Sequence, residues 1–212
     1  MILGLSTSGP YCGVALWHEG DVIGAAHEDL ARGQAERLMP MISEVLAEAG
    51  VPPEQLQAIG VGTGPGNFTG IRISVAAARG LALGLGIPAV GIPLMDALSL
   101  DAQRPALVSL SAGRGAVYLQ RFAADAGRGP ARVALDALDG WAHPDLTCIG
   151  DQAVEIAAKL GARAATPAVS PAVGVARLAA ARWQDAPAPP APLYLRAADA
   201  APARDAPPRI IP

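Results

Sequence analysis

A stretch of nine residues, 62–70, contains four glycines and is the part of the sequence best suited to chemistry. Glycine adopts positive φ angles without steric cost, so such a stretch can turn several backbone amides toward one point. Converging amides bind anions, and a helix that begins where the turn ends adds its partial positive charge. A small-and-apolar helical pattern follows over residues 71–85. The stretch is therefore typical of a phosphate-binding loop and equally typical of a tight turn that packs this helix on a sheet.

The residue types in the loop favour the packing turn. A Walker-type phosphate loop needs a lysine, and residues 62–70 contain none. A dinucleotide-binding loop needs a third glycine at the position that Asn67 occupies. Anion binding stays open as a secondary property supplied jointly with a partner. The residues concerned are Gly62, Gly64, Pro65, Gly66, Asn67, Phe68, Thr69 and Gly70.

Other residue types that carry chemistry are scattered along the sequence. No two of His18, His27 and His143 have the i, i+4 spacing that holds a metal ion on a helix. Cys12 and Cys148 have neither metal nor redox spacing and are typical of small buried residues. Most carboxylates fall at the ends of predicted elements, where capping accounts for them. We therefore predict no catalytic residue, no metal site and no cofactor bound by this chain alone.

Composition excludes other classes of function. The net charge is −3 and the isoelectric point is near 5.6, which argues against nucleic-acid binding by the chain alone. The N-terminus lacks the basic segment of a signal peptide. The longest uncharged run, residues 80–95, contains Pro88 and Pro93 and is too short to span a bilayer. We therefore expect a cytoplasmic protein without a membrane segment.

The elements around the loop follow from periodicity and turn signals. Residues 2–30 predict a meander of three strands. A helix is predicted from Glu36 to Gly50, and Pro40 in its first turns indicates a late start or a kink. Strand 58–62 leads into the loop. After helix 71–85 we expect a strand over 87–91 and a short helix over 94–102.

The second half of the chain repeats this order. In both halves a strand, a small polar turn with a glycine and a second strand follow one another, and Ser6 and Ser111 fall at matching places. Further strands are predicted over 132–135 and 147–150, and helices over 151–160 and 171–183. We predict two α/β lobes, 1–103 and 104–184, and a Pro/Ala-rich tail, 185–212, in which residues 193–195 dock on the body and the part beyond Arg196 is disordered.

Helix 71–85 has two distinct faces. One is apolar, and the other carries Ala76, Gly80 and Gly84 at i, i+4 and i+8. Each glycine costs a helix about 1 kcal/mol. Such a stripe is explained if another backbone approaches it closely, although packing within the fold is the alternative. The apolar face consists of Ile71, Val75, Ala78, Ala82 and Leu85.

Residues 61–73 and 79–88 together resemble the signature of the bacterial TsaB (YeaZ) family of tRNA threonylcarbamoyladenosine biosynthesis proteins. The resemblance extends along nearly the whole chain, through residues 2–8, 14–17, 36–42, 115–118 and 192–196. It implies a two-lobed, duplicated ribonuclease-H-like fold of the sugar kinase/Hsp70/actin (ASKHA) class. It also implies a non-catalytic subunit required to modify the adenosine next to the tRNA anticodon.

The resemblance further implies the partners. They are the catalytic paralogue TsaD, in a heterodimer, and the ATPase subunit TsaE; tRNA is contacted only through the complex. ATP or ADP, if bound, belongs at the partner interface. For the chain alone a homodimer and a monomer both stay open, since an exposed apolar face favours association. The expected interface lies on two helices and comprises Leu38, Met41, Ile42, Val45, Arg72, Ile73, Ala76, Ala77 and Gly80.

This sequence departs from the family at three places. The family usually has aspartates where this chain has Ser6 and Ser111, and a His-Ser pair where it has Gln34 and Ala35. Without the two carboxylates the chain lacks the oxygen ligands that hold a divalent cation. The departures argue against independent ATP hydrolysis and against peptidase activity. The alternative function is a small ATP-binding ATPase or kinase of the same fold.

Overall fold

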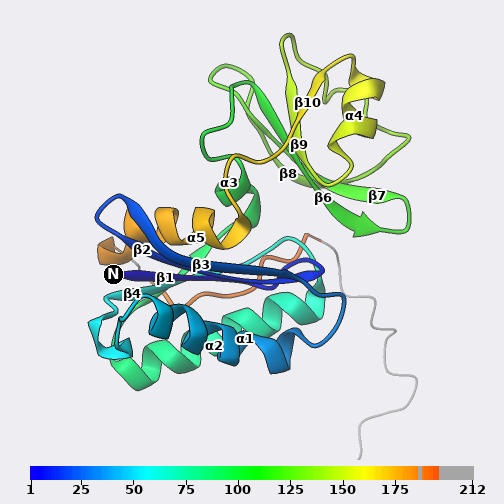
Figure 1. The fold of residues 1–212 in the computed structure, drawn as a ribbon. Helices are drawn as coiled ribbons and strands as arrows, with labels where there is room; N and C mark the ends of the chain where they lie inside the picture. The colour runs from blue at the N-terminus through cyan, green and yellow to red at the C-terminus, as the bar shows by residue number, and fades with distance from the viewer. Residues whose placement is uncertain (186–187, 196–212) are drawn as a thin grey trace, which may run out of the picture.

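The computed structural model describes residues 1–185 and 188–195 of the chain and contains two five-stranded sheets (Figure 1). The first has the order β3-β2-β1-β4-β5, and the second β10-β9-β6-β7-β8. In each sheet three consecutive strands form an antiparallel meander. The first strand of the meander also pairs, along its other edge, with two further strands that run parallel to it. The repetition of strand order confirms the predicted duplication. The strands are β1 (Ile2–Ser6), β2 (Tyr11–His18), β3 (Asp21–Asp29), β4 (Ala58–Gly62), β5 (Ala89–Ile92), β6 (Ala106–Gly113), β7 (Ala116–Phe122), β8 (Arg128–Ala134), β9 (Thr147–Gly150) and β10 (Arg163–Ala165).

Helices cover both faces of the first sheet. α1 and α2 lie on one face, and α5 lies on the other (Figure 1). Their apolar sides form separate buried clusters, one on each side of the sheet. α3 packs against α5, and α4 packs on the second sheet beside β9 and β10. The helices are α1 (Gln34–Glu48), α2 (Phe68–Leu85), α3 (Leu94–Leu98), α4 (Ala153–Leu160) and α5 (Pro171–Ala180), with short 3-10 turns at Pro53–Gln55 and Trp183–Asp185.

Two paired glycines let α5 lie close to the first sheet. Gly4 and Gly60 are register partners on β1 and β4. A Cβ atom on Gly4 would stand 2.7 Å from the Cβ of Ala176, and one on Gly60 would stand 2.6 Å from the Cβ of Ala179. The second lobe therefore does not comprise all of residues 104–184, because α5 packs on the first lobe's sheet.

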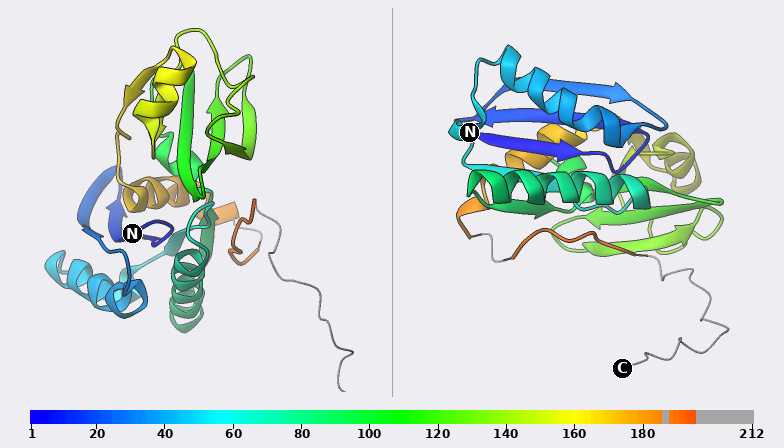
Figure 2. Two further views of the ribbon diagram at one scale, coloured as in Figure 1. Left: turned by 90° about the vertical axis from the view of Figure 1, so that its right-hand side faces the viewer. Right: turned by 90° about the horizontal axis from the view of Figure 1, so that it is seen from below.

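The chain ends, within the described residues, in an extended segment that we call the C-terminal strap, residues 188–195. The strap runs along the side of the first lobe near α2 (Figure 2). The Leu193 amide donates a hydrogen bond of 2.8 Å to the Thr63 carbonyl, and Leu195 packs against the cluster that contains Leu94 and Met95. Docking of residues 193–195 is thus confirmed. The prediction of disorder beyond Arg196 concerns a part of the chain that lies outside the described residues.

Several element boundaries differ from the prediction. α1 begins at Gln34, so Pro40 lies inside the helix rather than at a late start. α2 begins at Phe68 because the Asn67 side chain caps it, so the last three residues of the predicted loop belong to the helix. α3 ends at Leu98, before the predicted 102, and β10 was not predicted. β10 consists of three exposed residues, which carry no alternation of polar and apolar side chains.

Candidate functional site

The glycine loop packs against the turn between β1 and β2. A Cβ atom on Gly66 would stand 2.2 Å from the Ser8 carbonyl oxygen, and one on Gly70 would stand 1.9 Å from that of Thr7. Hydrogen bonds join the same segments: the Asn67 amide donates to the Ser8 carbonyl at 2.7 Å, and the Thr7 hydroxyl donates to the Gly70 carbonyl at 2.7 Å. The two glycines therefore allow backbone-to-backbone contact that any side chain would prevent.

Two amides of the loop that could face an anion are already engaged. The amide of Asn67 bonds to Ser8, and the amide of Gly70 donates to the Asn67 Oδ1 atom at 2.8 Å. Gly64, at φ 96°, is the loop residue that needs a left-handed backbone, and its carbonyl accepts from the amide of Leu94. The loop thus connects β4, α2, α3 and the β1–β2 turn through its own polar groups.

Ser6, the first of the two serines at matching places in the two lobes, is fully buried. Its hydroxyl lies 3.0 Å from the Tyr11 hydroxyl. Burial raises the pKa of Tyr11 above its usual value, with a smaller contribution from the charge of Asp151, so the phenol is protonated at neutral pH. The Ser8 hydroxyl is buried nearby and has no hydrogen-bond partner among the described residues. A hydroxyl pair at this place supplies no negative charge for a cation.

The matching position in the second sheet, Ser111, is exposed and uses its backbone. Its amide donates to the Asp151 Oδ2 atom at 2.8 Å. Asp151 follows β9, whose last residue, Gly150, has φ 98° and lies against the Ser109 carbonyl. The carboxylate of Asp151 therefore binds the backbone of Ser111 through one of its two oxygens.

Within residues 1–185 and 188–195, no three His, Cys, Asp or Glu side chains gather as they would around a metal ion. Each histidine faces a single carboxylate: His18 faces Glu19, His27 faces Asp29 and His143 faces Asp125, at 3.8, 3.5 and 3.6 Å. The cysteines are both buried, one in each sheet. Burial raises the pKa of both thiols to about 11.

The outer face of α2 is exposed along the whole helix. Leu83 is 85% exposed and Phe68 53% exposed, although both are large and apolar. Around Gly80 and Gly84 an added Cβ atom would meet nothing within 4 Å. The small-residue stripe therefore does not pack against the part of the chain that the structure describes. We define the outer face of α2 as its exposed residues Phe68, Thr69, Arg72, Ala76, Arg79, Gly80, Leu83 and Gly84.

The four α1 residues that we expected at a partner interface lie in the core instead. Leu38, Met41, Ile42 and Val45 are at most 4% exposed and belong to the cluster between α1, α2 and the first sheet. The apolar face of an amphipathic helix buries most area against its own sheet, which explains this position. Of the α2 residues, Ile73 and Ala77 are half-buried beside that cluster. The exposed apolar side chain of α1 is Met39, at 44%.

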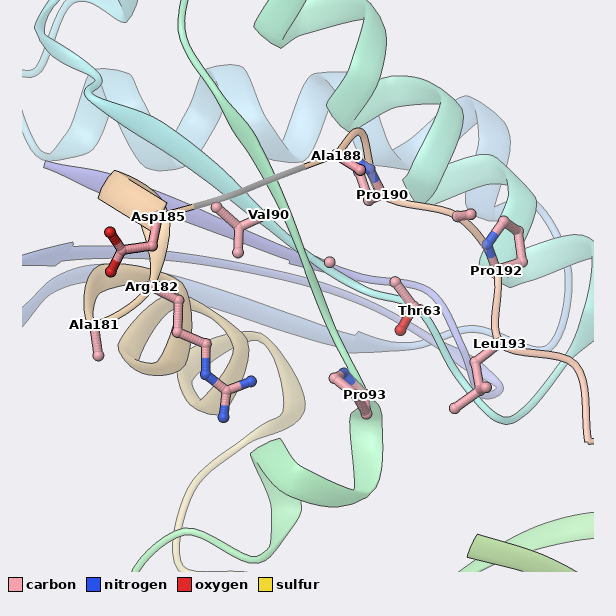
Figure 3. A pocket seen from close by; sticks show the side chains of 12 residues that line it. Thr63, Val90, Pro93, Ala181, Arg182, Asp185, Ala188, Pro190, Pro192 and Leu193 are labelled. Carbon is pink, nitrogen blue, oxygen red and sulfur yellow. The ribbon is translucent and has the colours of Figure 1, made fainter.

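A hollow of 590 Å³ lies between the strap, the end of α5 and the edge of the first sheet (Figure 3). Its lining includes Thr63 and Val90 from the sheet and Pro190 from the strap. Two charged residues, Arg182 and Asp185, lie at the α5 end. The hollow is mostly apolar. Sequence reasoning missed it because it depends on contacts of the strap with residues about 100 positions earlier in the chain.

α2 is the one described helix whose length and composition would suit a membrane span. Its residues Ile71, Val75 and Ala78 are buried in the core of the first lobe. The same apolarity is thus explained by packing on the sheet along one face.

Comparison with known proteins places this architecture in a family. Residues 22–170 match the family described as "TsaD: tRNA N6-adenosine threonylcarbamoyltransferase". The chain is 37% identical to an uncharacterised protein of Mycobacterium tuberculosis over 203 residues. This alignment covers 95% of this chain and 94% of that one. It is 35% identical to the tRNA threonylcarbamoyladenosine biosynthesis protein TsaB of Escherichia coli over 130 residues, 58% of this chain and 55% of that one. The solved structure of YeaZ from Pseudomonas aeruginosa superposes with a TM-score of 0.71 at 28% identity, covering 92% of this chain and 99% of that one.

The chain belongs to the TsaB/YeaZ family. A more distant likeness, to the ethanolamine utilization protein EutJ of Carboxydothermus hydrogenoformans, has a TM-score of 0.57 at 11% identity and concerns the fold alone. Together with the duplicated sheets, these likenesses confirm the two-lobed ASKHA-class fold. In this TsaB/YeaZ chain the glycine signature lies where β4 meets α2, directly beside Ser6 and Ser8.

Sequence reasoning missed two features of the surface in this TsaB/YeaZ chain. Leu83 stands on the outer face of α2, seven residues after Ala76, and that spacing is a signal that could have found it. Tyr194 contacts the first turn of α2, because the Arg72 Nε atom donates to its hydroxyl at 2.8 Å. No local pattern joins residues so far apart in the chain.

Proposed function

We propose that this chain is the non-catalytic partner subunit of tRNA threonylcarbamoyladenosine biosynthesis and that it forms a heterodimer with the catalytic paralogue TsaD. The observation that carries the proposal is the outer face of α2, where a stripe of small residues and two exposed large apolar side chains, Phe68 and Leu83, lie in solvent. Gly80 and Gly84 leave room for another backbone, and Leu83 offers an apolar side chain to a partner. Exposed apolar patches of this kind mark protein interaction sites.

Membership of the TsaB/YeaZ family supports this choice of partner. The match to the TsaD family over residues 22–170 supports a partner of related fold, and in the proposal that partner offers a helix equivalent to α2. Two helices with small residues at their contact can approach more closely than the usual 8–10 Å between helix axes. In the proposal the ATPase subunit TsaE joins the heterodimer, ATP or ADP binds only at the partner interface, and tRNA is reached through the complex in the cytoplasm.

The position of α1 modifies the expected interface. Since Leu38, Met41, Ile42 and Val45 are buried, they support α2 from below and do not contact the partner. Met39 and Ser43, one turn apart on the exposed side of α1, take their place in the proposal. When TsaD is absent, the same surface pairs with a second copy of this chain, because apolar area left in water favours association.

The proposal is tested by enlarging one residue of the outer face. Ala76 is exposed, so Ala76→Trp should leave the monomer folded, as judged by circular dichroism and the unfolding midpoint. We expect it to weaken binding to TsaD at least about hundredfold, since one bulky side chain separates the two backbones. The matched control is Val154→Trp, at a 76% exposed apolar residue of α4 in the other lobe. Equal affinity of the Ala76→Trp and Val154→Trp proteins for TsaD would overturn the proposal.

The alternative, an independent ATP-binding ATPase or kinase, predicts a different result. It requires ATP and magnesium to bind the isolated chain. The uncharged hydroxyl pair of Ser6 and Tyr11 and the lack, among the described residues, of any group of three His, Cys, Asp or Glu side chains argue against a cation there. Isothermal titration of the isolated chain with MgATP should give no heat of binding, and micromolar binding with turnover would favour the alternative.

A further inference from the structure

The C-terminal strap reaches the outer face of α2 through a cluster of three side chains, two from α2 and one from the strap. The Arg72 guanidinium lies 3.8 Å from the centroid of the Phe68 ring and donates from Nε to the Tyr194 hydroxyl at 2.8 Å. The rings of Phe68 and Tyr194 stand 5.2 Å apart, tilted by 32°. Phe68 and Arg72 are one helical turn apart and so contact each other on α2. Tyr194 of the strap is the third member of the cluster.

Independent contacts hold Tyr194 in this place. On one side of it, the Leu193 amide donates to Thr63, and on the other, Leu195 enters the apolar cluster of α3 and the second sheet. Further back, Pro190 lies against Gly91, where an added Cβ atom would stand 3.2 Å from the proline ring. The strap is therefore attached at both sides of Tyr194 and presents this side chain at a fixed point beside the first turn of α2.

Helical geometry shows which edge of the outer face the strap occupies. Successive residues of an α-helix are turned by about 100°. Arg72 and Arg79 therefore lie along one edge of the outer face, Ala76 and Leu83 along its middle, and Ala77 along the edge beside α1. The half-buried Ala77 packs against the α1 cluster, and Arg72 contacts the strap. The outer face is thus bordered by α1 on one side and by Tyr194 on the other.

We infer that Tyr194 and the strap are part of the partner-binding surface, and that the cluster of Phe68, Arg72 and Tyr194 forms its second border. The inference rests on the proposed function, because it takes the partner to be the paralogue that covers α2. Two observations favour direct contact. Phe68 and Tyr194 remain 53% and 45% exposed although they stack with Arg72, so apolar ring surface still faces solvent. Aromatic residues and arginine are the types that contribute most at protein interfaces.

The cluster also explains a charged residue at an apolar surface. Among the described residues Arg72 has no carboxylate within ion-pair distance, and its Nε donor is directed to the tyrosine. The two aromatic rings and the Tyr194 hydroxyl orient the guanidinium, so a group that accepts from its remaining donors would lose less conformational entropy than one that binds a free side chain. A partner carboxylate or backbone carbonyl is the chemical group that these donors fit.

The test compares Tyr194→Ala and Tyr194→Phe in the full-length chain, with affinity for TsaD measured by titration. We expect Tyr194→Ala to weaken binding about tenfold, and Tyr194→Phe, which keeps the ring and loses the hydroxyl, to weaken it by less than about threefold. Binding should also slow amide hydrogen exchange in residues 188–195, most clearly at Leu193. Unchanged affinity of the Tyr194→Ala protein, or faster exchange of the strap upon binding, would overturn the inference.

The outcomes for the strap and for the proposed function can be told apart. If Ala76→Trp abolishes binding while Tyr194→Ala does not affect it, the partner surface is confirmed and the role of the strap is refuted. If neither change affects binding, the proposed function fails at its own test. Thermal unfolding of each variant serves as the control for folding, since Tyr194 is almost half exposed and its loss should lower the midpoint only slightly.

Discussion

A single added methyl group on α2 should have opposite effects on stability at Gly70 and at Gly80. At Gly70 the new Cβ atom would stand 1.9 Å from the Thr7 carbonyl oxygen, a backbone atom that cannot rotate away. The helix and the β1–β2 turn must separate by about 1.5 Å to reach an ordinary contact distance. At Gly80 the Cβ atom meets nothing within 4 Å, so only the helix propensity changes.

The two magnitudes follow from these contacts. Overpacking costs roughly 1–3 kcal/mol, and loss of the Thr7 hydroxyl's bond to the Gly70 carbonyl adds about 1 kcal/mol, so Gly70→Ala should destabilise the fold by about 2–4 kcal/mol. Gly80→Ala should stabilise it by about 1 kcal/mol. For a chain of this size the unfolding midpoint then falls by roughly 4–16 °C in the first variant and rises by about 2–4 °C in the second.

The assay is urea unfolding of both purified variants beside the wild type, monitored by far-ultraviolet circular dichroism, with thermal scans as a second measure. An unchanged midpoint for Gly70→Ala would refute the argument that the glycine loop is a packing element. It would show that the β1–β2 turn yields freely, and the loop would again be open to an anion. A destabilised Gly80→Ala protein would refute the assignment of Gly80 to an open surface.

Three further predictions concern α5, α1 and the thiols. Gly4→Ala should destabilise the chain by about 1–3 kcal/mol, because the new Cβ atom would stand 2.5 Å from the Ala172 carbonyl oxygen of α5; a wild-type unfolding midpoint would contradict the packing of α5 on the first sheet. Leu38→Ala should lower the free energy of unfolding, measured in urea, by about 2–5 kcal/mol. Met39→Ala should change stability little and instead weaken binding to TsaD. The reverse pattern would show that Leu38, and not Met39, contacts the partner. Burial raises the pKa of the Cys12 and Cys148 thiols from 9.0 to about 11, so the folded state favours the protonated form and this contribution to stability is complete below pH 9 and lost as the pH rises toward 11; rapid labelling of both thiols by iodoacetamide in the native protein at pH 8 would show that they are not buried.

Local patterns predicted most of the elements that position the site. Strand 58–62, the glycine loop and the apolar face of the following helix could be predicted because each depends on neighbours in sequence. The same holds for the duplication, since both halves repeat one order of strands and turns. The start of α2 at Phe68 is also a local feature, because the Asn67 side chain caps the helix. The glycines on both sides of Asn67 favoured a loop, so the cap was not recognised.

Features that depend on distant parts of the chain could not be predicted. An apolar helical face indicates burial without saying what buries it, so Leu38 and Val45 were assigned to a partner although their own sheet covers them. To predict that α5 packs on the first sheet, one would have to know that Gly4 and Gly60 contact Ala176 and Ala179. The contact between Arg72 and Tyr194 joins residues separated by 122 positions.

The most direct test of the proposed function is the tRNA modification itself. Cells depleted of this protein should be analysed by mass spectrometry of tRNA nucleosides, and rescued with the wild-type chain, with Ala76→Trp or with Val154→Trp. The proposal predicts that threonylcarbamoyladenosine falls on depletion and returns with the wild type and Val154→Trp but not with Ala76→Trp. Normal threonylcarbamoyladenosine in the depleted cells would contradict it.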